Sequence, residues 1–386
     1  MLNTIAIRGY RSLREVVLPL TALTVVTGAN GTGKSSVYRA LGLLADCGRG
    51  DVISSLAREG GLQSVLWAGP ENTSGARRTG VSEGTARTRP VSLELGFSAT
   101  DFGYLIDLGL PQDPGHKSMF GRDPEIKREV VFAGAVPRPS STLVRRTRDY
   151  AEVASDSGRG FDELSRSLPA YRSVLAEYAN PIALPELHAV RDRLRDWRFY
   201  DGFRVDRHAP ARQPQVGTRT PVLGNDGTDL AAAVQTILES GFDDLPRAVA
   251  DAFEGAEVSV AARDGLFELQ LHQRGMLRPL RAAELSDGTL RFLLWGAALS
   301  TTAPPALMVL NEPETSLHPD LVCPLADMIA VAARRTQVVV VTHSSVLLGR
   351  LIACDASEVE LVKQWGETQV DGQTMITAPA WDWGKR

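Results

Sequence analysis

Hydrophobic residues near the start of the chain form a short continuous run and then change to helical spacing. Residues 23–27 are almost all apolar, which is typical of a strand buried on both faces of a parallel sheet. A glycine-rich turn follows, and residues 37–46 then place apolar side chains at helical spacing. The pattern predicts a strand, a tight turn and a helix in direct succession. A β-rich run at residues 4–7 predicts one more strand before them.

The middle of the chain has a different pattern. Residues 91–97, 104–110 and 128–133 are short β-rich runs separated by turn residues, which predict an antiparallel sheet. From about residue 150 to residue 250 the spacing is mainly helical and is interrupted by prolines. Because no sustained heptads occur in that stretch, we expect no long coiled-coil arm.

The last part of the chain returns to alternating strands and helices. The predicted elements are a hairpin at 258–262 and 266–272 turned by Asp264 and Gly265, a helix after Gly288, a strand at 307–310, a helix at 321–333, a strand at 337–341 and a hairpin at 358–362 and 367–370. Strand–helix alternation at both ends of the chain predicts an α/β fold. We expect a mainly parallel core sheet with an antiparallel β lobe and a helical insertion.

Composition and charge limit the kind of protein further. The 386 residues include 42 Lys and Arg against 46 Asp and Glu, so a net charge of −4 argues against a wholly basic nucleic-acid coat. The three cysteines are far apart and form no CxxC pair, which favours free thiols in a reducing compartment; they are Cys47, Cys323 and Cys354. No apolar run approaches the roughly 20 residues that span a bilayer. We therefore expect a cytoplasmic protein with no membrane partner.

The most specific motif lies in the turn between the first buried strand and its helix. Gly28-x-x-x-x-Gly33-Lys34-Ser35 matches the P-loop pattern in its usual context, although a glycine-rich turn that merely begins a helix is the alternative. Glycines let backbone N–H groups wrap phosphates, the lysine reaches the β- and γ-phosphates, and the serine hydroxyl can bind Mg²⁺. The motif predicts binding of a nucleoside triphosphate. The residues expected to contact it are Asn30, Gly31, Thr32, Gly33, Lys34, Ser35 and Ser36.

A second motif, Leu-Ser-Asp-Gly-Thr at residues 285–289, precedes a predicted helix. The Ser286 hydroxyl, the flexible Gly288 and the helix N-terminus together could form another phosphate-binding surface. Ser-Asp-Gly is also a good helix cap and turn, so the motif alone is weak. The motif lies shortly before a buried strand that ends in acids, and this position strengthens the prediction of a phosphate-binding role.

That strand ends in Asn311, Glu312, Pro313 and Glu314, and it resembles a Walker B strand. Glu312 is expected to act as the general base or to orient the attacking water. Asn311 stands where an acid is usual; it keeps a carbonyl oxygen for a magnesium-bound water but carries no charge. We therefore expect Ser35 and Asn311, the latter through water, at the metal, and slow turnover. Glu314 serves as a contact in the following loop or as a helix cap.

Two histidines complete the candidate chemistry. His343 follows the next buried strand, at a position that resembles the switch histidine of ABC-type ATPases. The resemblance implies that it contacts the γ-phosphate as a catalytic residue, although a lone histidine is more often structural. His318, between the two strands, either faces a dimer mate or starts the helix at Pro319.

The order of these motifs resembles that of ABC-type ATPases, and within them the RecF/SMC-like group, especially the bacterial AAA-family ATPases of the RecF type. The resemblance rests on IRGYRSL at 7–13, GANGTGKSS at 28–36, LSDGT at 285–289, NEPETSLHP at 311–319 and VVVVTHSS at 338–345. It covers residues 1–46 and 280–350. It implies a P-loop NTPase head in two halves, residues 1–150 and 256–386, separated by a mainly helical insertion at 151–255.

The resemblance also implies a mechanism. Two heads would sandwich ATP and Mg²⁺, with Lys34 of one copy and Ser286 and Gly288 of the other on the same γ-phosphate, so ATP would hold a homodimer together. The expected function is a switch ATPase in DNA repair or anti-phage DNA transactions. The alternative is a low-turnover, nucleotide-gated scaffold that controls a protein partner or effector. The Q-loop glutamine of the group has two candidates, Gln63 and Gln112.

A stretch at residues 187–219 is a candidate DNA contact. It carries eight arginines interleaved with aromatic residues, which suits phosphate and base contacts; the arginines are Arg191, Arg193, Arg195, Arg198, Arg204, Arg207, Arg212 and Arg219. Four aspartates partly cancel the charge. A solvated helix with ordinary core aromatics is therefore the alternative interpretation.

Overall fold

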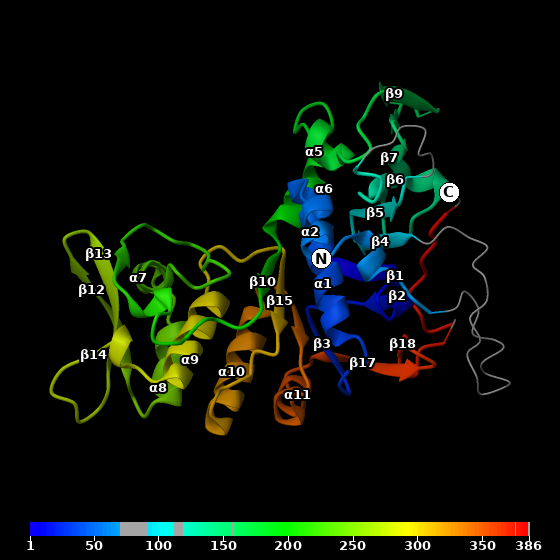
Figure 1. The fold of residues 1–386 in the computed structure, drawn as a ribbon. Helices are drawn as coiled ribbons and strands as arrows, with labels where there is room; N and C mark the ends of the chain where they lie inside the picture. Colours follow the sequence, from blue (N-terminus) through cyan, green and yellow to red (C-terminus); the bar gives the residue numbers. More distant parts are fainter. Residues whose placement is uncertain (70–91, 112–118, 156, 159, 375, 385–386) are drawn as a thin grey trace. The chain divides into compact units, whose positions relative to one another are not determined.

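The computed structural model describes residues 1–69, 92–111, 119–155, 157–158, 160–374 and 376–384 (Figure 1). These residues form two compact units. The first consists of Met1–Thr21, Thr27–Trp197 and Val359–Arg386, and the second of Ala22–Val26 and Arg198–Glu358. Both mix strands with helices, as the predicted α/β class requires.

The first unit contains an antiparallel sheet of eight strands in the order β2-β1-β4-β5-β6-β7-β8-β9. The strands are β1 (Leu2–Tyr10), β2 (Leu13–Pro19), β4 (Leu93–Ala99), β5 (Phe102–Gly109), β6 (Glu125–Ala133), β7 (Thr142–Thr147), β8 (Tyr150–Ala154) and β9 (Phe161–Ser165). The three predicted strands in this region are confirmed as β4, β5 and β6. The sheet continues through β8 and β9, past residue 150, where the sequence pattern predicted mainly helix.

Helices and the end of the chain cover the central strands of this sheet. The helices are α1 (Lys34–Arg49), α2 (Val52–Arg58), α3 (Leu62–Val65), α5 (Val174–Tyr178) and α6 (Pro185–Asp196). Helix α1 packs against α6 and β4, and α6 also contacts β5. Trp381 and Trp383 pack on Ala6 and Leu105. Every residue of β4 is consequently buried.

A buried ionic network ties α5 to the middle of the same sheet. Glu129, in β6, accepts hydrogen bonds from the Tyr104 hydroxyl at 2.7 Å and the Ser173 hydroxyl at 2.5 Å. It also accepts the Val174 backbone N–H at 3.0 Å and pairs with Arg146 at 2.9 Å. Burial raises the pKa of the Tyr104 hydroxyl well above its ordinary value, so Tyr104 donates as a neutral phenol. The Glu129 carboxylate therefore has four donors from three segments, which are β5, β7 and the start of α5.

The second unit is built on four parallel strands in the order β10-β15-β16-β3. They are β10 (Arg198–Tyr200), β15 (Leu307–Asn311), β16 (Gln337–Val341) and β3 (Leu23–Gly28). The last two residues of β3 belong to the first unit. Val26 is the register partner of Val341, and Val341 is the partner of Asn311. The carboxyl ends of the strands thus lie in one row.

Helices and a small antiparallel sheet complete the second unit. The helices are α7 (Leu230–Ser240), α8 (Asp244–Ala252), α9 (Asp287–Leu299), α10 (Pro319–Ala332) and α11 (Ser345–Ile352), and the sheet contains β11 (Gln215–Val216), β12 (Glu257–Arg263), β13 (Leu266–His272) and β14 (Leu280–Arg281). The predicted hairpin turn between β12 and β13 is confirmed. Asp264 and Gly265 both have positive φ, 52° and 78°, as a two-residue hairpin turn requires.

Three expectations from the sequence can be compared directly with the fold. The closing hairpin is confirmed as β17 (Ser357–Gln364) and β18 (Glu367–Val370). Cys47, Cys323 and Cys354 are free cysteines, and burial raises the pKa of the Cys47 thiol. Within the described part of the chain, the helices are all too short or too polar to span a bilayer.

The Glu129 network predicts a large loss of stability when its charge is removed. Glu129→Gln preserves the side-chain shape but leaves the fully buried Arg146 guanidinium without a countercharge, which costs about 3–5 kcal/mol of unfolding free energy. The urea midpoint, followed by fluorescence, should fall accordingly. Glu163→Gln, which removes the same charge from the exposed pair with Arg166, should leave the midpoint unchanged. Equal midpoints for the two variants would contradict the role of the network.

Candidate functional site

The P-loop joins β3 to α1 and depends on its glycines. Gly28, Gly31 and Gly33 have positive φ angles of 137°, 79° and 108°, which other residues rarely adopt. A Cβ at Gly33 would lie 2.5 Å from the Thr368 Oγ1, and a Cβ at Gly28 would lie 2.3 Å from the Leu361 carbonyl oxygen. The loop is therefore closely packed against the β17–β18 hairpin. Its shape requires glycine at both positions.

Lys34 is folded back over this loop. Its Nζ donates to the carbonyl oxygens of Gly28 at 2.7 Å and Ala29 at 3.2 Å, and the residue is 6% exposed. Its partners among the described residues are carbonyl oxygens and not carboxylates, so the positive charge is available to an anion at the loop. Gly33, the residue before the helix, provides no side-chain cap to α1. The first N–H groups of a 16-residue helix are thus open to an anionic ligand.

The other predicted P-loop contacts differ in exposure. Thr32 is buried because its hydroxyl donates to the Ala29 carbonyl at 2.8 Å and its own carbonyl accepts the Thr368 hydroxyl at 2.6 Å. Thr32 therefore holds the loop through its side chain. The remaining members are at least partly accessible; Asn30, Gly31 and Ser35 are exposed and Ser36 is half-buried. These residues can reach a ligand without a change in the fold.

The Leu-Ser-Asp-Gly-Thr motif begins α9. The Ser286 hydroxyl accepts the Thr289 N–H at 3.1 Å and therefore caps the helix, which is the structural role weighed for it above. Ser286 is nevertheless exposed, and a Cβ at Gly288 would meet no atom within 4 Å. The helix N-terminus is accordingly open to a ligand. Both expected residues lie on this accessible first turn.

A buried arginine that sequence reasoning assigned elsewhere holds this motif in place. Arg212 donates to the carbonyl oxygens of Ala282 at 3.1 Å and Leu285 at 2.7 Å, and it pairs with Asp287 at 2.6 Å. Its side chain is 7% exposed. Sequence analysis counted Arg212 among the candidate DNA contacts. The structure instead makes it a positioning residue for the turn before α9.

Glu312 and His343 lie side by side at the carboxyl ends of β15 and β16. The His343 Nδ1 is 3.3 Å from the Glu312 Oε1 and 3.9 Å from the Glu314 Oε1. Glu312 has a left-handed backbone, with φ of 46°, and its N–H donates to the Val341 carbonyl at 2.7 Å. This turn directs the chain across the end of β16. Both side chains remain accessible, at 53% for His343 and 38% for Glu312.

Glu314 has a clear structural partner that the sequence did not predict. Its Oε1 accepts the Thr342 hydroxyl at 2.5 Å, and its side chain is only 8% exposed. Glu314 thereby connects the segment after β15 to the segment that carries His343. The helix that follows is capped by His318 instead, whose Nδ1 accepts the Asp320 N–H at 3.3 Å. His318 therefore starts α10, one of the two roles expected for it.

Asn311 is paired with an acid from the neighbouring strand. Its Nδ2 donates to the Asp201 Oδ1 at 2.7 Å, while its Oδ1 is buried and has no hydrogen-bond partner among the described residues. Sequence reasoning missed Asp201 as part of this site. The available signal was its position directly after residues 198–200, but that run is too short to read as a strand.

The arginine-rich stretch 187–219 belongs largely to the two protein cores. In the first unit, Trp197 is fully buried and its ring meets Phe97 edge-on. In the second unit, Tyr200 and Phe203 are buried against Trp295. These aromatic rings cannot stack on nucleic-acid bases without unfolding. The structure thus favours the alternative interpretation of core aromatics.

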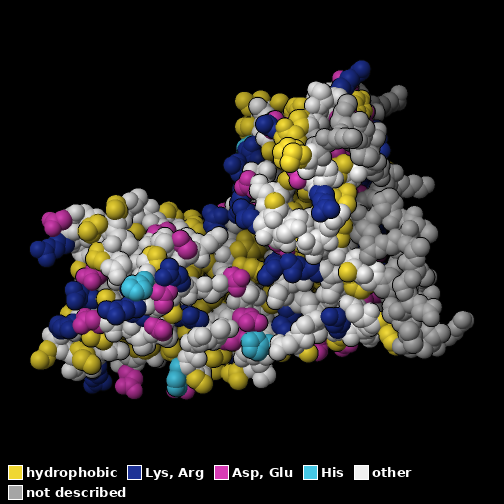
Figure 2. Space-filling view, viewed as in Figure 1, with side chains coloured by type: hydrophobic (Ala, Val, Ile, Leu, Met, Phe, Trp, Pro, Cys, Tyr) yellow, Lys and Arg dark blue, Asp and Glu magenta, His cyan; other side chains and the backbone are white. Residues whose placement is uncertain are grey.

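Charge on the surface gives the same indication. Besides the buried Arg212, four arginines of the stretch are paired with acids; they are Arg191 with Asp192, Arg193 with Asp101, Arg204 with Asp206 and Arg219 with Glu239. Figure 2 shows basic and acidic side chains interspersed over the face in view. Of the two Q-loop candidates, Gln63 is an exposed residue of α3 and Gln112 lies outside the described residues.

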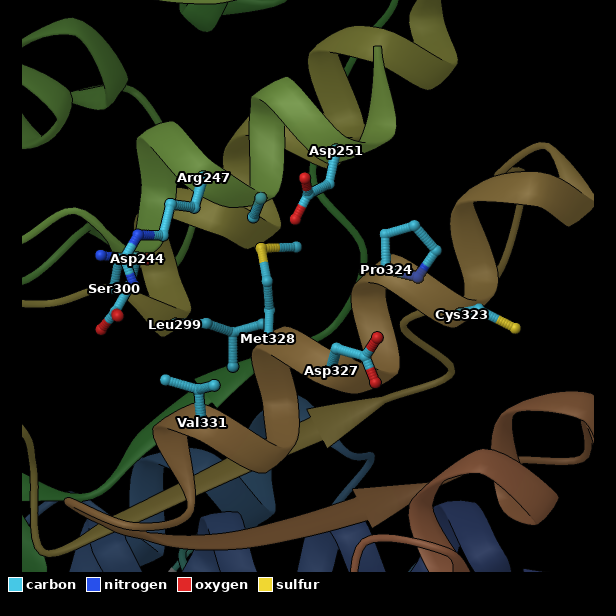
Figure 3. Close-up of a pocket in the computed structure, with 11 residues that line it drawn as sticks. Asp244, Arg247, Asp251, Leu299, Ser300, Cys323, Pro324, Asp327, Met328 and Val331 are labelled. Carbon is cyan, nitrogen blue, oxygen red and sulfur yellow. The ribbon is translucent and has the colours of Figure 1, made fainter. Parts of the chain in front are cut away.

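A cavity of about 400 Å³ lies elsewhere in the second unit, between α8 and α10 (Figure 3). Leu299, Met328 and Val331 contribute to its apolar part. Its acidic groups are those of Asp244, Asp251 and Asp327. It contains none of the residues expected to bind nucleotide. The candidate site therefore consists of loop and strand-end residues and not of this cavity.

Comparisons with known proteins identify a family for this chain. Over residues 23–349, the sequence matches the family described as "AAA domain, putative AbiEii toxin, Type IV TA system". Among curated proteins, no sequence matches the chain. The matched range covers most of the chain, and it includes the P-loop, the Leu-Ser-Asp-Gly-Thr motif, Glu312 and His343. This chain belongs to that AAA family.

Solved structures give a consistent picture of the fold. An SMC head bound to the C-winged helix domain of ScpA aligns with 98% of this chain and 99% of its own, at 15% identity and a TM-score of 0.50. The SMC head domain from Thermotoga maritima aligns over 97% and 99%, at 13% identity and a TM-score of 0.44. A head with an extended coiled coil, bound to the C-terminal domain of ScpA from Pyrococcus furiosus, aligns over 98% and 97%, at 14% identity and a TM-score of 0.49. The fold is that of an SMC-like ATPase head.

The P-loop geometry predicts that Gly33→Ala impairs nucleotide binding. The new Cβ would collide with the Thr368 hydroxyl, and the φ of 108° would strain any residue with a side chain by about 1–3 kcal/mol. The affinity for ATP, measured by calorimetric titration, should fall at least about tenfold. Gly42→Ala in the middle of α1, where a Cβ meets no atom within 4 Å, should leave the affinity unchanged. Wild-type affinity in Gly33→Ala would contradict the role given to the loop.

Proposed function

We propose that this chain is an ABC-type switch ATPase that binds ATP with Mg²⁺ and closes into a head-to-tail homodimer. The observation that carries the proposal is the row formed by Val26, Val341 and Asn311 across three parallel strands. Two residues beyond Val26 the chain enters the P-loop, and one residue beyond Asn311 stands Glu312. Phosphate-binding and acidic segments thus begin at the same edge of the sheet, as in doubly wound folds that bind ligands there.

The P-loop half of the proposal rests on an electrostatic fit to a polyphosphate. The uncapped N-terminus of α1, the positive-φ glycines and the buried Lys34 ammonium all favour an anion at the loop. Lys34 would exchange its carbonyl partners for the β- and γ-phosphate oxygens, which are stronger acceptors because they are charged.

The residues present also fit a magnesium ion. Ser35 offers an exposed hydroxyl at the start of α1, and Asn311 offers a buried oxygen with no partner among the described residues. Oxygen donors of this kind are those that Mg²⁺ prefers, often through its retained waters. When bound, the ion would neutralise charge on the triphosphate. Ser35 would hold it directly, and Asn311 would hold one of its waters.

Glu312 and His343 are the groups we assign to hydrolysis. Glu312 would accept the proton of the attacking water, and its left-handed backbone and the bond to the Val341 carbonyl fix where its carboxylate starts. His343 would donate to the γ-phosphate. The buried Glu314 supports both, because its bond to the Thr342 hydroxyl orients the residue before His343.

Dimerisation is proposed from the accessibility of the α9 N-terminus. Ser286 is exposed and Gly288 has open space around it, so a γ-phosphate held by a second copy could reach the first turn of α9. Arg212 and Asp287 would keep this turn rigid before the partner arrives. ATP would then act as the ligand that stabilises the closed dimer, and hydrolysis would allow the two copies to separate.

The process that uses this switch is proposed as DNA repair or anti-phage DNA transactions in the cytoplasm. The support is the likeness to SMC and RecF-type heads. Since Trp197, Tyr200 and Phe203 are buried, a DNA contact there would depend mainly on arginines. The second candidate function, a low-turnover scaffold for a protein effector, is favoured by the uncharged Asn311 and by the toxin–antitoxin wording of the family description.

Hydrolysis and binding should separate in two variants. Glu312→Gln is expected to bind ATP as the wild type does but to lose at least about 100-fold in turnover, the range of general-base catalysis. Lys34→Ala should lose ATP binding itself. Both are measured by equilibrium titration and steady-state phosphate release. Stimulation of the wild type by DNA would favour the DNA role, and turnover indifferent to DNA would favour the protein-partner role. Full turnover in Glu312→Gln would refute the assignment of the base.

Blocking the α9 N-terminus should prevent dimerisation without preventing ATP binding. In a Glu312→Gln background, Ser286→Arg places a bulky cation where the partner's γ-phosphate is expected, so sedimentation with ATP should show only monomer. Ser286→Asn is the matched control, because asparagine caps helices as well as serine does; it separates loss of the cap from obstruction of the surface. ATP-dependent dimers in Ser286→Arg would contradict the sandwich arrangement.

A further inference from the structure

We propose that Asp201 supplies the negative charge toward magnesium that Asn311 lacks, and that Asn311 holds the Asp201 carboxylate in place. The inference rests on the proposed ATP-binding function and adds a residue to it. The usual acid at the end of β15 is thus replaced by a carboxylate from β10, the next strand of the sheet.

Strand register brings the two side chains together. Strand β10 is parallel to β15, and Tyr200 is the register partner of Leu310. Asp201 and Asn311 each come one residue later in the shared strand direction, so they lie at the same level at the carboxyl ends of the two strands. The Asn311 Nδ2 donates to the Asp201 Oδ1 at 2.7 Å, a short and direct hydrogen bond. The amide therefore faces β10 with its donor and leaves its oxygen for another partner.

The Asn311 oxygen shows that the pair is incomplete on its own. Asn311 Oδ1 is buried and has no hydrogen-bond partner among the described residues. Buried polar atoms in native proteins nearly always have one, and an orphaned oxygen indicates a missing donor or cation. A magnesium-bound water is a strong donor of this kind.

Counting charge explains why asparagine suits position 311. An aspartate there would lie within hydrogen-bonding distance of Asp201, and two carboxylates at one site cannot both ionise easily. An amide next to a carboxylate keeps one negative charge at the strand ends, which is what a single acid on β15 would provide. The negative charge therefore lies at the end of β10 instead of at the end of β15. Turnover need not be slow on this account.

A purely structural role for the pair is less consistent with its surroundings. Asp201 is exposed, and Gly202 after it has a φ of 69° that begins a loop. A hydrogen bond to a charged group contributes about 1.5–3 kcal/mol, and solvent screening reduces that contribution when the carboxylate is exposed. The bond would restrict the carboxylate to one orientation and leave its second oxygen for a ligand. That is the behaviour expected of a positioning contact beside a cation.

The test exchanges the two side chains. ATP affinity is measured by equilibrium titration in Mg²⁺ and in EDTA, and Mn²⁺ bound in the presence of ATP is counted by electron paramagnetic resonance. Asp201→Asn should reduce the gain in affinity that Mg²⁺ provides by at least about tenfold and weaken Mn²⁺ binding, while affinity in EDTA stays the same. The double variant Asp201→Asn with Asn311→Asp should recover to within about threefold of the wild type, because it restores one carboxylate to the pair. Asp206→Asn, which removes the same charge from an exposed pair with Arg204, should change nothing.

The outcomes separate this inference from the proposed function. A wild type that binds ATP with a Mg²⁺-dependent gain, together with an unaffected Asp201→Asn, overturns the role of Asp201 alone. The role of Asp201 is also overturned if Asn311→Asp alone raises the affinity for Mg²⁺, because the amide at position 311 would then be what limits binding of the ion. A wild type that binds no ATP, or binds it without any effect of Mg²⁺, overturns the proposed nucleotide site and this inference with it. Thermal melting of each variant confirms that the fold is intact before these comparisons.

Discussion

Parallel backbone pairing between β3, β16, β15 and β10 is the constraint on which the candidate chemistry depends. These strands come from three regions of the chain that are far apart in sequence, and only their hydrogen-bonded register gives Val26, Val341, Asn311 and Asp201 a common level. Each functional segment begins one or two residues after its strand. A slip of one residue in any pair would turn the following side chains to the other face and separate them. Strands β15 and β16 are almost wholly apolar and buried, as is typical of parallel strands that are covered on both faces.

Polar side chains then fix the segments that leave the sheet. Arg212 holds the turn before α9, Glu314 connects the loops after β15 and β16, and Thr368 holds the P-loop. In each case a buried or half-buried polar group satisfies backbone or hydroxyl partners that would otherwise be orphaned. The candidate residues Glu312, His343 and Ser286, by contrast, remain accessible. Rigid support beneath reachable groups is the arrangement that catalysis by positioning requires.

Elements with a strong period could be predicted from the sequence, and contacts that depend on tertiary structure could not. The buried strands β3, β15 and β16, the helix after the P-loop and the Asp264–Gly265 turn follow from local pattern. Strands β7 to β9 were missed because they are half-polar and short, so their side chains carry no clear alternation. Asp201 was missed because β10 has only three residues, and Arg212 was misassigned because composition cannot distinguish a buried arginine from a surface one. The sequence identified the P-loop, the helix cap at the start of α9, and Glu312 and His343 as candidate residues. It did not identify the residues that hold these groups in place.

The contact between Thr368 and the P-loop has a consequence for synthesis of the chain. The Thr368 hydroxyl donates to the Thr32 carbonyl, and the Thr368 N–H donates to the Ser12 carbonyl at 2.9 Å, so a residue near the end of the sequence braces a loop near its beginning. A ribosome that has made only the first half of the protein has therefore produced the glycine-rich motif without the hairpin that shapes it. The phosphate-binding loop would acquire its final form only once β18 has emerged, which delays nucleotide capture until that hairpin has been translated.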